Sequence, residues 1–537
     1  MKRVLVTEPL AEEAMRALAE HVQVDSRPGL SEQALVEAIG DYDGLVVRSA
    51  TQVTAEVIRA GKRLQVIGRA GIGVDNIDLA QATRRGIIVV NVPSGNTIAV
   101  AEHTIGLMLA LARHIPRSDA GLRAGRWEKR GLTGIEVRGK VLGLVGLGRI
   151  GTAVAQRAAG LEMQIIAYDP FVSPERAARA GVRLVDLEQL LRTADFISVH
   201  TPLTERTRHL IGAEALALVK PTARLINCAR GEIVDEAALL AALESGRLAG
   251  AALDVFEQEP LGPDSPLRRC DKAILTPHLA AATEEAQLAV SLDVARQVWE
   301  VLEGLPPRAP VNAPFLDPEA LAELRPYLEL AERMGSFYAQ MAGNNLVRLD
   351  LTYGGDVADK NVELLRAALL IGLLCSVSEE PLNLINAAMV AESRGLALTE
   401  HRVPEADNFA GLITLRVLTT QGERVLAGTV MRQEPHIVRI DDYWLDFVAE
   451  GLLLVSEHVE QPGIIGRMGT ILGEAGINIH FVQVGRRQRG GQGAMVLGID
   501  DALSEQALGQ VLQLPSIRSA HLVSLPACAF DRFATCG

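Results

Sequence analysis

Apolar and polar positions alternate along residues 1–98 in the manner of a parallel α/β sheet. Amphipathic stretches typical of helices cover residues 7–19 and 31–39. They accompany four short apolar runs that predict strands: Val4–Val6, Gly44–Val47, Val66–Ile67 and Ile87–Asn91. Strands that alternate with helices favour parallel pairing, because the crossover helices cover the faces of the sheet. The pattern therefore predicts a parallel sheet with covered faces, the first of two Rossmann-like, doubly wound α/β domains.

A second series of strands follows a long apolar helix predicted at Ile98–Arg113. These strands recur at intervals of about 25 residues, as a doubly wound sheet requires, and lie at residues 140–145, 164–169, 196–199, 223–227, 250–254 and 273–276. The apolar helix has too many apolar positions for one buried stripe, so we expect part of it to pack against a second subunit. A helix at Glu284–Gly304 is expected to return the chain to the first domain.

The rest of the sequence predicts two smaller domains after a proline-rich linker at Leu305–Pro318. An α+β region is expected first, with helices near residues 319–341 and 361–393 and a hairpin over 412–430 that turns at Gln421 and Gly422. Residues 451–525 follow the order β-α-β-β-α-β, which is typical of a ferredoxin-like fold. We therefore predict four domains, the first completed by residues 282–308: residues 1–98, 99–281, 316–450 and 451–525.

A glycine motif in the second series predicts a dinucleotide site. The apolar run that begins at Lys140 leads directly into G-x-G-x-x-G, formed by Gly146, Gly148 and Gly151, and a helical pattern follows. These glycines allow a tight turn, a close approach of backbone to a pyrophosphate, and packing of helix on strand. The next strand ends in Asp169, whose carboxylate would accept the ribose hydroxyls of NAD and repel the extra phosphate of NADP. The pattern therefore predicts NAD as the cofactor.

Composition narrows the range of partners. The chain has 537 residues and a net charge of −13, which disfavours nucleic acid and acidic membrane surfaces. Its five cysteines lack C-x-x-C spacing and nearby paired histidines, so neither a disulfide framework nor a metal site is expected. The start of the chain does not resemble a signal peptide, and the longest apolar run, Ala367–Val377, is too short to span a bilayer. We expect a cytoplasmic protein.

Three polar residues follow strands of the second series, where open α/β sheets place their sites: Arg230, Glu259 and His278. An arginine can bind a carboxylate at two points. A histidine oriented by a carboxylate can accept a hydroxyl proton near neutral pH. Each residue taken singly is more often structural, but together they predict an NAD-dependent enzyme that oxidises a hydroxyl beside a carboxylate.

The same segments resemble the D-2-hydroxyacid dehydrogenase family. The resemblance is carried, in chain order, by G-L-G-R-I-G, Cys228–Asp235, Asp254–Pro260 and Thr276–His278. Two N-terminal segments, Val47–Thr51 and Gly68–Asp78, fit one subgroup of this family, and the middle region matches its longer, four-domain form through its placement. Residues 451–525 resemble an ACT domain, a small-molecule regulatory module.

The resemblance implies oxidation of 3-phospho-D-glycerate by NAD at C2, the first step of L-serine synthesis. It implies that Arg230 binds the substrate carboxylate and carbonyl, and that His278 acts as acid and base with Glu259 as its partner. The implied cofactor contacts, besides the motif glycines, are Arg149, Ile150, Asp169, Thr201, Cys228, Ala229, Arg230, Asp254, His278, Leu279, Ala280 and Ala281. The implied substrate contacts are Arg48, Ser49, Gly71, Ile72, Gly73, Lys129 and Arg130.

The ACT resemblance implies an amino-acid effector, with L-serine as the expected ligand. His458 and Asn478 lie where related domains bind an amino acid between paired copies, so a homodimer or homotetramer is expected. Three alternatives stay open on the sequence alone. The chain could be a glyoxylate or hydroxypyruvate reductase, an NAD-sensing binding protein on the same fold, or an amino-acid sensor built on the last two domains.

Overall fold

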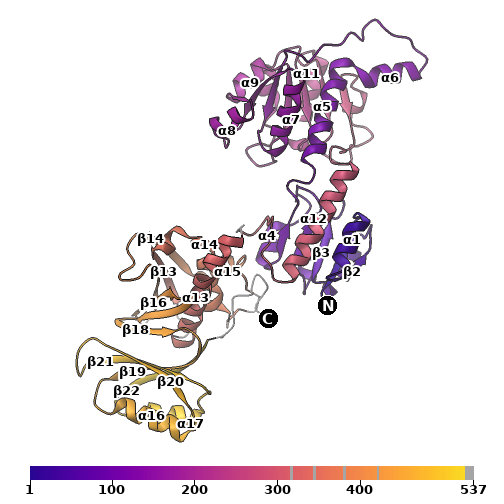
Figure 1. The fold of residues 1–537 in the computed structure, drawn as a ribbon. Helices are drawn as coiled ribbons and strands as arrows, with labels where there is room; N and C mark the ends of the chain where they lie inside the picture. Colours follow the sequence, from indigo (N-terminus) through magenta and orange to yellow (C-terminus); the bar gives the residue numbers. More distant parts are fainter. Residues whose placement is uncertain (315–317, 343–345, 376, 379–381, 420–421, 526–537) are drawn as a thin grey trace. The chain divides into compact units, whose positions relative to one another are not determined.

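The structure, a computed structural model, describes residues 1–314, 318–342, 346–375, 377–378, 382–419 and 422–525. The chain divides into two units, each with its own sheets (Figure 1). The first unit contains Met1–Pro9, Met15–Asn91 and the chain from Val294 onward. The second unit contains Leu10–Ala14 and Val92–Asp293.

A five-stranded parallel sheet forms the N-terminal part of the first unit. One face is covered by α2 (Glu32–Ala38), α3 (Ala55–Ala60) and α4 (Leu79–Arg84), and the other by the C-terminal part of α12 (Glu284–Leu302). The sheet order is β2-β1-β3-β4-β5, with β1 at Arg3–Val6, β2 at Gln23–Ser26, β3 at Gly44–Val47, β4 at Val66–Arg69 and β5 at Ile88–Val90. The four predicted strands are confirmed, whereas the mostly polar sequence of β2 gives no strand pattern.

The first helix starts later than its pattern predicts. Helix α1 covers Glu12–Ala19, although the amphipathic stretch begins at Thr7. The Thr7 amide instead continues the sheet by donating to the Val46 carbonyl at 3.1 Å. The Thr7 hydroxyl lies 2.9 Å from that of Thr51. Sheet pairing therefore takes precedence over helix propensity at this end.

A seven-stranded parallel sheet forms the second unit, in the order β12-β11-β10-β9-β6-β7-β8. Its strands are β6 (Val141–Val145), β7 (Gln164–Tyr168), β8 (Arg183–Leu184), β9 (Phe196–Val199), β10 (Arg224–Asn227), β11 (Gly250–Leu253) and β12 (Ala273–Leu275). The chain order reverses between β6 and β9, which is where doubly wound sheets bind ligands. The predicted doubly wound fold is confirmed.

Helices cover both faces of this sheet (Figure 1). One apolar cluster involves α5 (Thr97–Arg113), α7 (Arg149–Gly160) and α8 (Pro174–Arg179). The other involves α9 (Leu187–Thr193), α10 (Ala213–Leu218) and α11 (Glu236–Glu244). Helix α6, which was not predicted, covers Ile115–Arg123.

A six-stranded sheet with three helices follows α12 in the first unit. Helix α13 covers Pro318–Ala342, and the helical stretch predicted over 361–393 contains two helices, α14 (Val362–Leu374) and α15 (Ala387–Ser393). The sheet order is β14-β13-β15-β16-β17-β18, with strands at Ala397–Val403, Leu346–Gly355, Gly411–Thr419, Gly422–Met431, Glu434–Ile440 and Tyr443–Val448. The predicted hairpin is confirmed as β15 and β16, and its expected turn residue Gln421 lies outside the described residues.

The last sheet has the predicted ferredoxin-like order. Strands β20 (Ile479–Arg486), β21 (Gln492–Ile499), β19 (Gly451–Val459) and β22 (Ile517–Leu525) lie side by side and pair antiparallel. One face of this sheet packs on α16 (Ile464–Glu474) and α17 (Glu505–Leu512). The opposite face shares a core with α13, in which Val455 and Val496 lie among the same buried residues as Phe337. The last two domains therefore have one continuous core.

The proline-rich stretch is only partly a free linker. Val311 donates to the Val89 carbonyl at 2.8 Å, and the Asn312 side chain bonds to Val89 N at 2.8 Å and to the Ile87 carbonyl at 2.9 Å. Residues 309–312 therefore extend the edge of the first sheet at β5.

Within the described segments, no single helix has both the length and the apolar character needed to cross a membrane. The bent pair α5 and α6, whose axes differ by 64°, meets the length and composition criteria only when the two helices are combined.

Two glycines set the packing of α13 on α14. A Cβ at Gly335 would overlap the carbonyl oxygen of Leu369, and one at Gly372 would overlap that of Glu332. We predict that Gly372→Ala destabilises this domain by about 1–3 kcal/mol, the usual cost of overpacking. Gly509→Ala in α17 is the matched control, because no heavy atom lies within 4 Å of its Cβ. It should stabilise by about 0.5–1 kcal/mol. Chemical unfolding would measure both, and equal midpoints for the two variants would contradict the packing argument.

Candidate active site

The glycine motif forms the turn between β6 and α7. Gly146 has a φ of +99°, and a Cβ there would lie 2.5 Å from the carbonyl oxygen of His200. Gly151 packs directly against the Gly146 carbonyl, which brings helix and strand together. Gly148 caps the 12-residue helix α7, and no heavy atom lies within 4 Å of its Cβ position. Because the helix N-terminus opens at this point, the turn fits a pyrophosphate.

Asp169 follows β7 and is oriented by two backbone amides. Its Oδ2 accepts a hydrogen bond of 2.8 Å from Leu147 N, and its Oδ1 accepts one of 2.9 Å from Phe171 N. The first bond ties the carboxylate to the glycine turn. Each carboxylate oxygen has a further acceptor direction, so the residue fits the two ribose hydroxyls of NAD.

Two titratable residues near this turn are uncharged at neutral pH. Burial lowers the pKa of His200 to about 4, and its Nε2 lies 2.8 Å from Ser198 Oγ. Burial raises the pKa of Cys228 to about 12, so its thiol keeps its proton. Neither group is suited to exchange a proton near pH 7. The sequence did not mark His200 as a site residue, although His200 directly precedes the predicted contact Thr201.

The loop after β10 carries Arg230 and is fixed by Asn227. The Asn227 side chain accepts a loop amide at 3.0 Å and donates to the Arg230 carbonyl at 2.9 Å. Gly231 lets the loop pass against the backbone of Phe256, which any Cβ at Gly231 would overlap. The Arg230 loop therefore lies against the segment that leads to Glu259.

His278 and Glu259 lie within hydrogen-bonding distance of each other. His278 Nδ1 lies 2.7 Å from Glu259 Oε2, and Glu259 Oε1 accepts a 3.1 Å bond from Phe256 N. Burial tends to raise the pKa of Glu259, but the hydrogen bond with His278 and the positive charge of Arg230 help to hold it below its usual value. The carboxylate is therefore charged at neutral pH. With Nδ1 engaged by Glu259, a substrate proton would be exchanged at Nε2.

The buried carboxylate of Asp254 holds the turn that carries His278. Asp254 is 0% exposed and accepts bonds from Thr276 Oγ1 at 2.5 Å, Leu279 N at 2.8 Å and Ala280 N at 2.9 Å. Its backbone carbonyl accepts the His278 amide at 2.8 Å. These bonds hold His278 at a φ of +54°, which few residues other than glycine adopt. The predicted cofactor residues 279–281 belong to the same segment.

In the first unit, the loop after β3 carries Arg48 and Ser49. The Glu8 carboxylate accepts hydrogen bonds from the amides of Arg48, Ala50 and Thr51 at 2.8, 3.2 and 2.9 Å. These amides are therefore occupied within the domain. The side chains of this loop remain accessible, since Ser49 is exposed and Arg48 partly exposed.

The predicted substrate loop 71–73 follows β4. Asn91 holds it through a 2.5 Å bond from Nδ2 to the Ile72 carbonyl. A Cβ at Gly71 would overlap the guanidinium of Arg69, so this arginine lies across the loop. Arg69 is a cation at the predicted site that sequence analysis did not single out, although it lies inside the motif Gly68–Asp78.

Lys129 and Arg130 lie in the second unit, on an exposed segment after α6. Trp127, two residues earlier in this segment, is 86% exposed. The predicted contact of these two cations with substrate remains a prediction.

The two predicted effector residues differ in accessibility. His458 on β19 is 1% exposed, and burial lowers its pKa. Its Nδ1 is buried with no hydrogen-bond partner among the described residues, and the same holds for the hydroxyls of Ser456 and Ser516. Asn478 is exposed and donates to Asp500 Oδ2 at 2.8 Å. In a single copy of the domain, a ligand can reach Asn478 directly but not the His458 ring.

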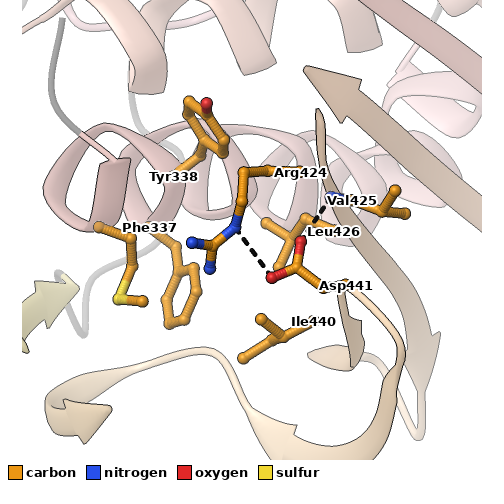
Figure 2. Close-up of a pocket in the computed structure, with 8 residues that line it drawn as sticks. Phe337, Tyr338, Arg424, Val425, Leu426, Ile440 and Asp441 are labelled. Carbon is orange, nitrogen blue, oxygen red and sulfur yellow. Dashed lines mark hydrogen bonds and ion pairs between the residues drawn. The ribbon is translucent and has the colours of Figure 1, made fainter. Parts of the chain in front are cut away.

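A cavity beside α13 is too small for an amino acid. Its volume is about 20 Å³, enough for one water molecule. Figure 2 shows Arg424 paired with Asp441 at its edge, with Nε and Oδ2 2.8 Å apart. Arg424 also lies 3.1 Å from Glu457 on β19. The cavity therefore marks an ionic link between β16 and the last sheet.

The chain is similar to known proteins over nearly its whole length. A D-3-phosphoglycerate dehydrogenase of Synechocystis is 45% identical over 98% of this chain and 95% of its own length. That of Methanocaldococcus jannaschii is 43% identical over 98% of this chain and 100% of its own length. The chain belongs to the D-3-phosphoglycerate dehydrogenase family.

Three stretches of the chain match known domain families. Residues 105–280 match the NAD-binding domain of D-isomer-specific 2-hydroxyacid dehydrogenases. Residues 323–441 match the D-3-phosphoglycerate dehydrogenase intervening domain, and 452–516 match the ACT domain. A solved structure of a protein from Thermus thermophilus is 38% identical, with a TM-score of 0.54, over 57% of this chain and 99% of that protein. The chain is therefore an NAD-dependent oxidoreductase.

Cofactor preference should depend on Asp169. We predict that Asp169→Ala weakens the preference for NAD over NADP, because the ribose hydroxyls lose an acceptor and a 2′-phosphate meets no repulsion. The ratio of kcat/KM values for NAD and NADP measures this. A variant with the ratio of the unmodified chain would show that Asp169 does not select the cofactor.

Proposed function

We propose that this chain oxidises 3-phospho-D-glycerate to 3-phosphohydroxypyruvate with NAD, the first step of L-serine synthesis. The observation that carries the proposal is the His278–Glu259 pair, 2.7 Å apart, on a turn of the NAD-binding unit. The names of the full-length relatives support the choice of substrate.

In this reaction the C2 hydroxyl loses its proton to His278 Nε2, and the C2 hydrogen leaves as hydride. Glu259 keeps Nδ1 engaged, so the ring is oriented, and its negative charge stabilises the imidazolium that forms. Arg230 binds the substrate carboxylate and the developing carbonyl through its planar guanidinium. It cannot take the proton, because it stays charged throughout the accessible pH range.

The proposed NAD contacts are the open N-terminus of α7 for the pyrophosphate and Asp169 for the ribose. Arg149, Ile150, Thr201, Cys228, Ala229, Asp254 and residues 278–281 complete this set by family resemblance. When bound, NAD accepts the hydride. We further propose that the side chains of Arg48 and Ser49, with loop 71–73 and Arg69, bind the substrate's anionic groups, and that Lys129 and Arg130 add to this charge.

A panel of 2-hydroxy acids tests the proposed substrate. We expect the highest kcat/KM with NAD for 3-phospho-D-glycerate, with much lower values for D-glycerate and D-lactate, which lack the phosphate. Glyoxylate and hydroxypyruvate, offered with NADH, test the reductase alternative. If glyoxylate and hydroxypyruvate are turned over faster than 3-phospho-D-glycerate and 3-phosphohydroxypyruvate, the proposal is overturned.

His278 should carry the proton. His278→Asn keeps a side chain able to hydrogen bond but removes the titrating group, so we predict a fall in kcat of about 100- to 10,000-fold. Glu259→Gln should cost less. Because a neutral amide stabilises imidazolium less than a carboxylate does, the acidic limb of its pH profile should move to lower pH. Near-normal turnover in His278→Asn, with an unchanged pH profile, is incompatible with this mechanism.

We infer that the chain assembles as a homodimer or homotetramer in the cytoplasm. Exposed apolar side chains on α6 and the segment after it support assembly: Ile115 is 54%, Leu122 58% and Trp127 86% exposed. The ACT match supports an amino-acid effector, and we propose L-serine, bound near Asn478 and His458 between paired copies.

Regulation should be separable from chemistry. We predict that a chain ending at Asn312 keeps dehydrogenase activity and loses its response to L-serine. The cut lies after Asn312 because this residue bonds to β5. It lies before α13 because the ACT sheet shares a core with that helix. Rates with and without L-serine measure the effect. A folded truncation that is still inhibited would refute this division.

A further inference from the structure

Helix α5 brings a histidine to the turn that carries His278. His103 Nε2 lies 3.3 Å from Asp254 Oδ1 and 3.3 Å from Thr276 Oγ1. Its side chain is 25% exposed. No sequence motif marks this residue, which lies on a helix predicted only as an apolar element.

The Asp254–Thr276 pair requires the His103 ring to donate a hydrogen bond from Nε2. The Thr276 hydroxyl donates its only proton to Asp254 Oδ1 at 2.5 Å, so toward His103 it can act only as an acceptor. Burial tends to raise the pKa of Asp254, but hydrogen bonds from His103, Thr276 and two backbone amides outweigh burial and lower it. The carboxylate is therefore ionised and also only accepts. Both neighbours of His103 Nε2 require a donor.

We propose that His103 is a positioning residue for proton transfer. Its Nε2–H binds Asp254 and Thr276 together and so fixes the turn that presents His278 to Glu259. The inference rests on the proposed function, because it concerns the same reaction. In this proposal His103 acts through Asp254 and Thr276, the residues that its Nε2 approaches.

The geometry explains why the loss would be felt at His278. Asp254 reaches the turn through its carboxylate, at Thr276 and Leu279, and through its carbonyl, at the His278 amide. The turn holds His278 at a φ of +54°, a conformation that needs support from its surroundings. Removal of the His103 donor from this network would let the His278 ring move relative to the substrate. A displacement of about 1 Å can cost about 100-fold in rate.

Five variants test the proposal: His103→Leu, His103→Gln, Thr276→Val, the His103→Leu/Thr276→Val double variant, and Glu102→Gln as a control. The Gln variant keeps an N–H near the place of Nε2, and the Leu variant removes it. Glu102 is the neighbouring residue on α5, and its side chain is 63% exposed. For each full-length variant, kcat, KM for 3-phospho-D-glycerate and the thermal unfolding midpoint are measured.

We expect His103→Leu to lower kcat about tenfold, with KM changed less than about twofold, since placement of the proton acceptor rather than binding is lost. His103→Gln should recover most of this rate. The double variant should be no slower than the slower single variant by more than about twofold, because both changes act on one network. Glu102→Gln should behave as the unmodified chain.

Three kinetic results would overturn the inference. They are a His103→Leu kcat within twofold of the unmodified chain, a His103→Gln variant as slow as His103→Leu, and losses that multiply in the double variant. If all His103 variants share a lowered unfolding midpoint without rescue by Gln, the residue is merely structural and the inference fails. An unmodified chain that is inactive on 3-phospho-D-glycerate would instead refute the proposed function on which the inference rests.

Discussion

The buried carboxylate of Asp254 is the constraint on which the turn that carries His278 depends. A fully buried carboxylate is costly unless every oxygen is hydrogen-bonded, and here donors from Thr276, Leu279 and Ala280 meet that need. The donors all come from one short segment, so satisfying the charge also fixes the backbone of that segment. His278 lies within it and is thereby presented to Glu259 in a strained but defined conformation. The bonds that satisfy the buried charge are therefore the bonds that place His278.

Burial also determines which titratable groups near the glycine turn can exchange protons. It keeps His200 neutral and Cys228 protonated, because each would be charged in a poorly solvated place. Glu259 is partly buried as well, but its partners keep it ionised. Glu259 therefore remains a charged partner for His278, whereas His200 and Cys228 are not suited to exchange a proton near pH 7.

The sequence predicted most strands of the two parallel sheets, the glycine turn and the pair formed by His278 and Glu259, because hydrophobic spacing and strand-end position are local signals. It could not predict β2, whose strand is polar and exists through pairing with β1. The predicted start of α1 was wrong, because the Thr7 amide bonds to the Val46 carbonyl on β3. His103 and Arg69 were missed for the same reason: their roles come from side chains that only the folded chain brings together. The shared core of α13 and the ACT sheet is likewise a tertiary property.

A crystal structure of the chain with NAD and 3-phospho-D-glycerate tests the proposed proton transfer to His278 most directly. We expect the C2 hydroxyl oxygen to lie about 2.6–3.2 Å from His278 Nε2, while Nδ1 remains on Glu259 and Asp254 keeps its bonds to the turn. A substrate whose C2 hydroxyl bonds to a different base, with His278 turned away from it, would contradict this role.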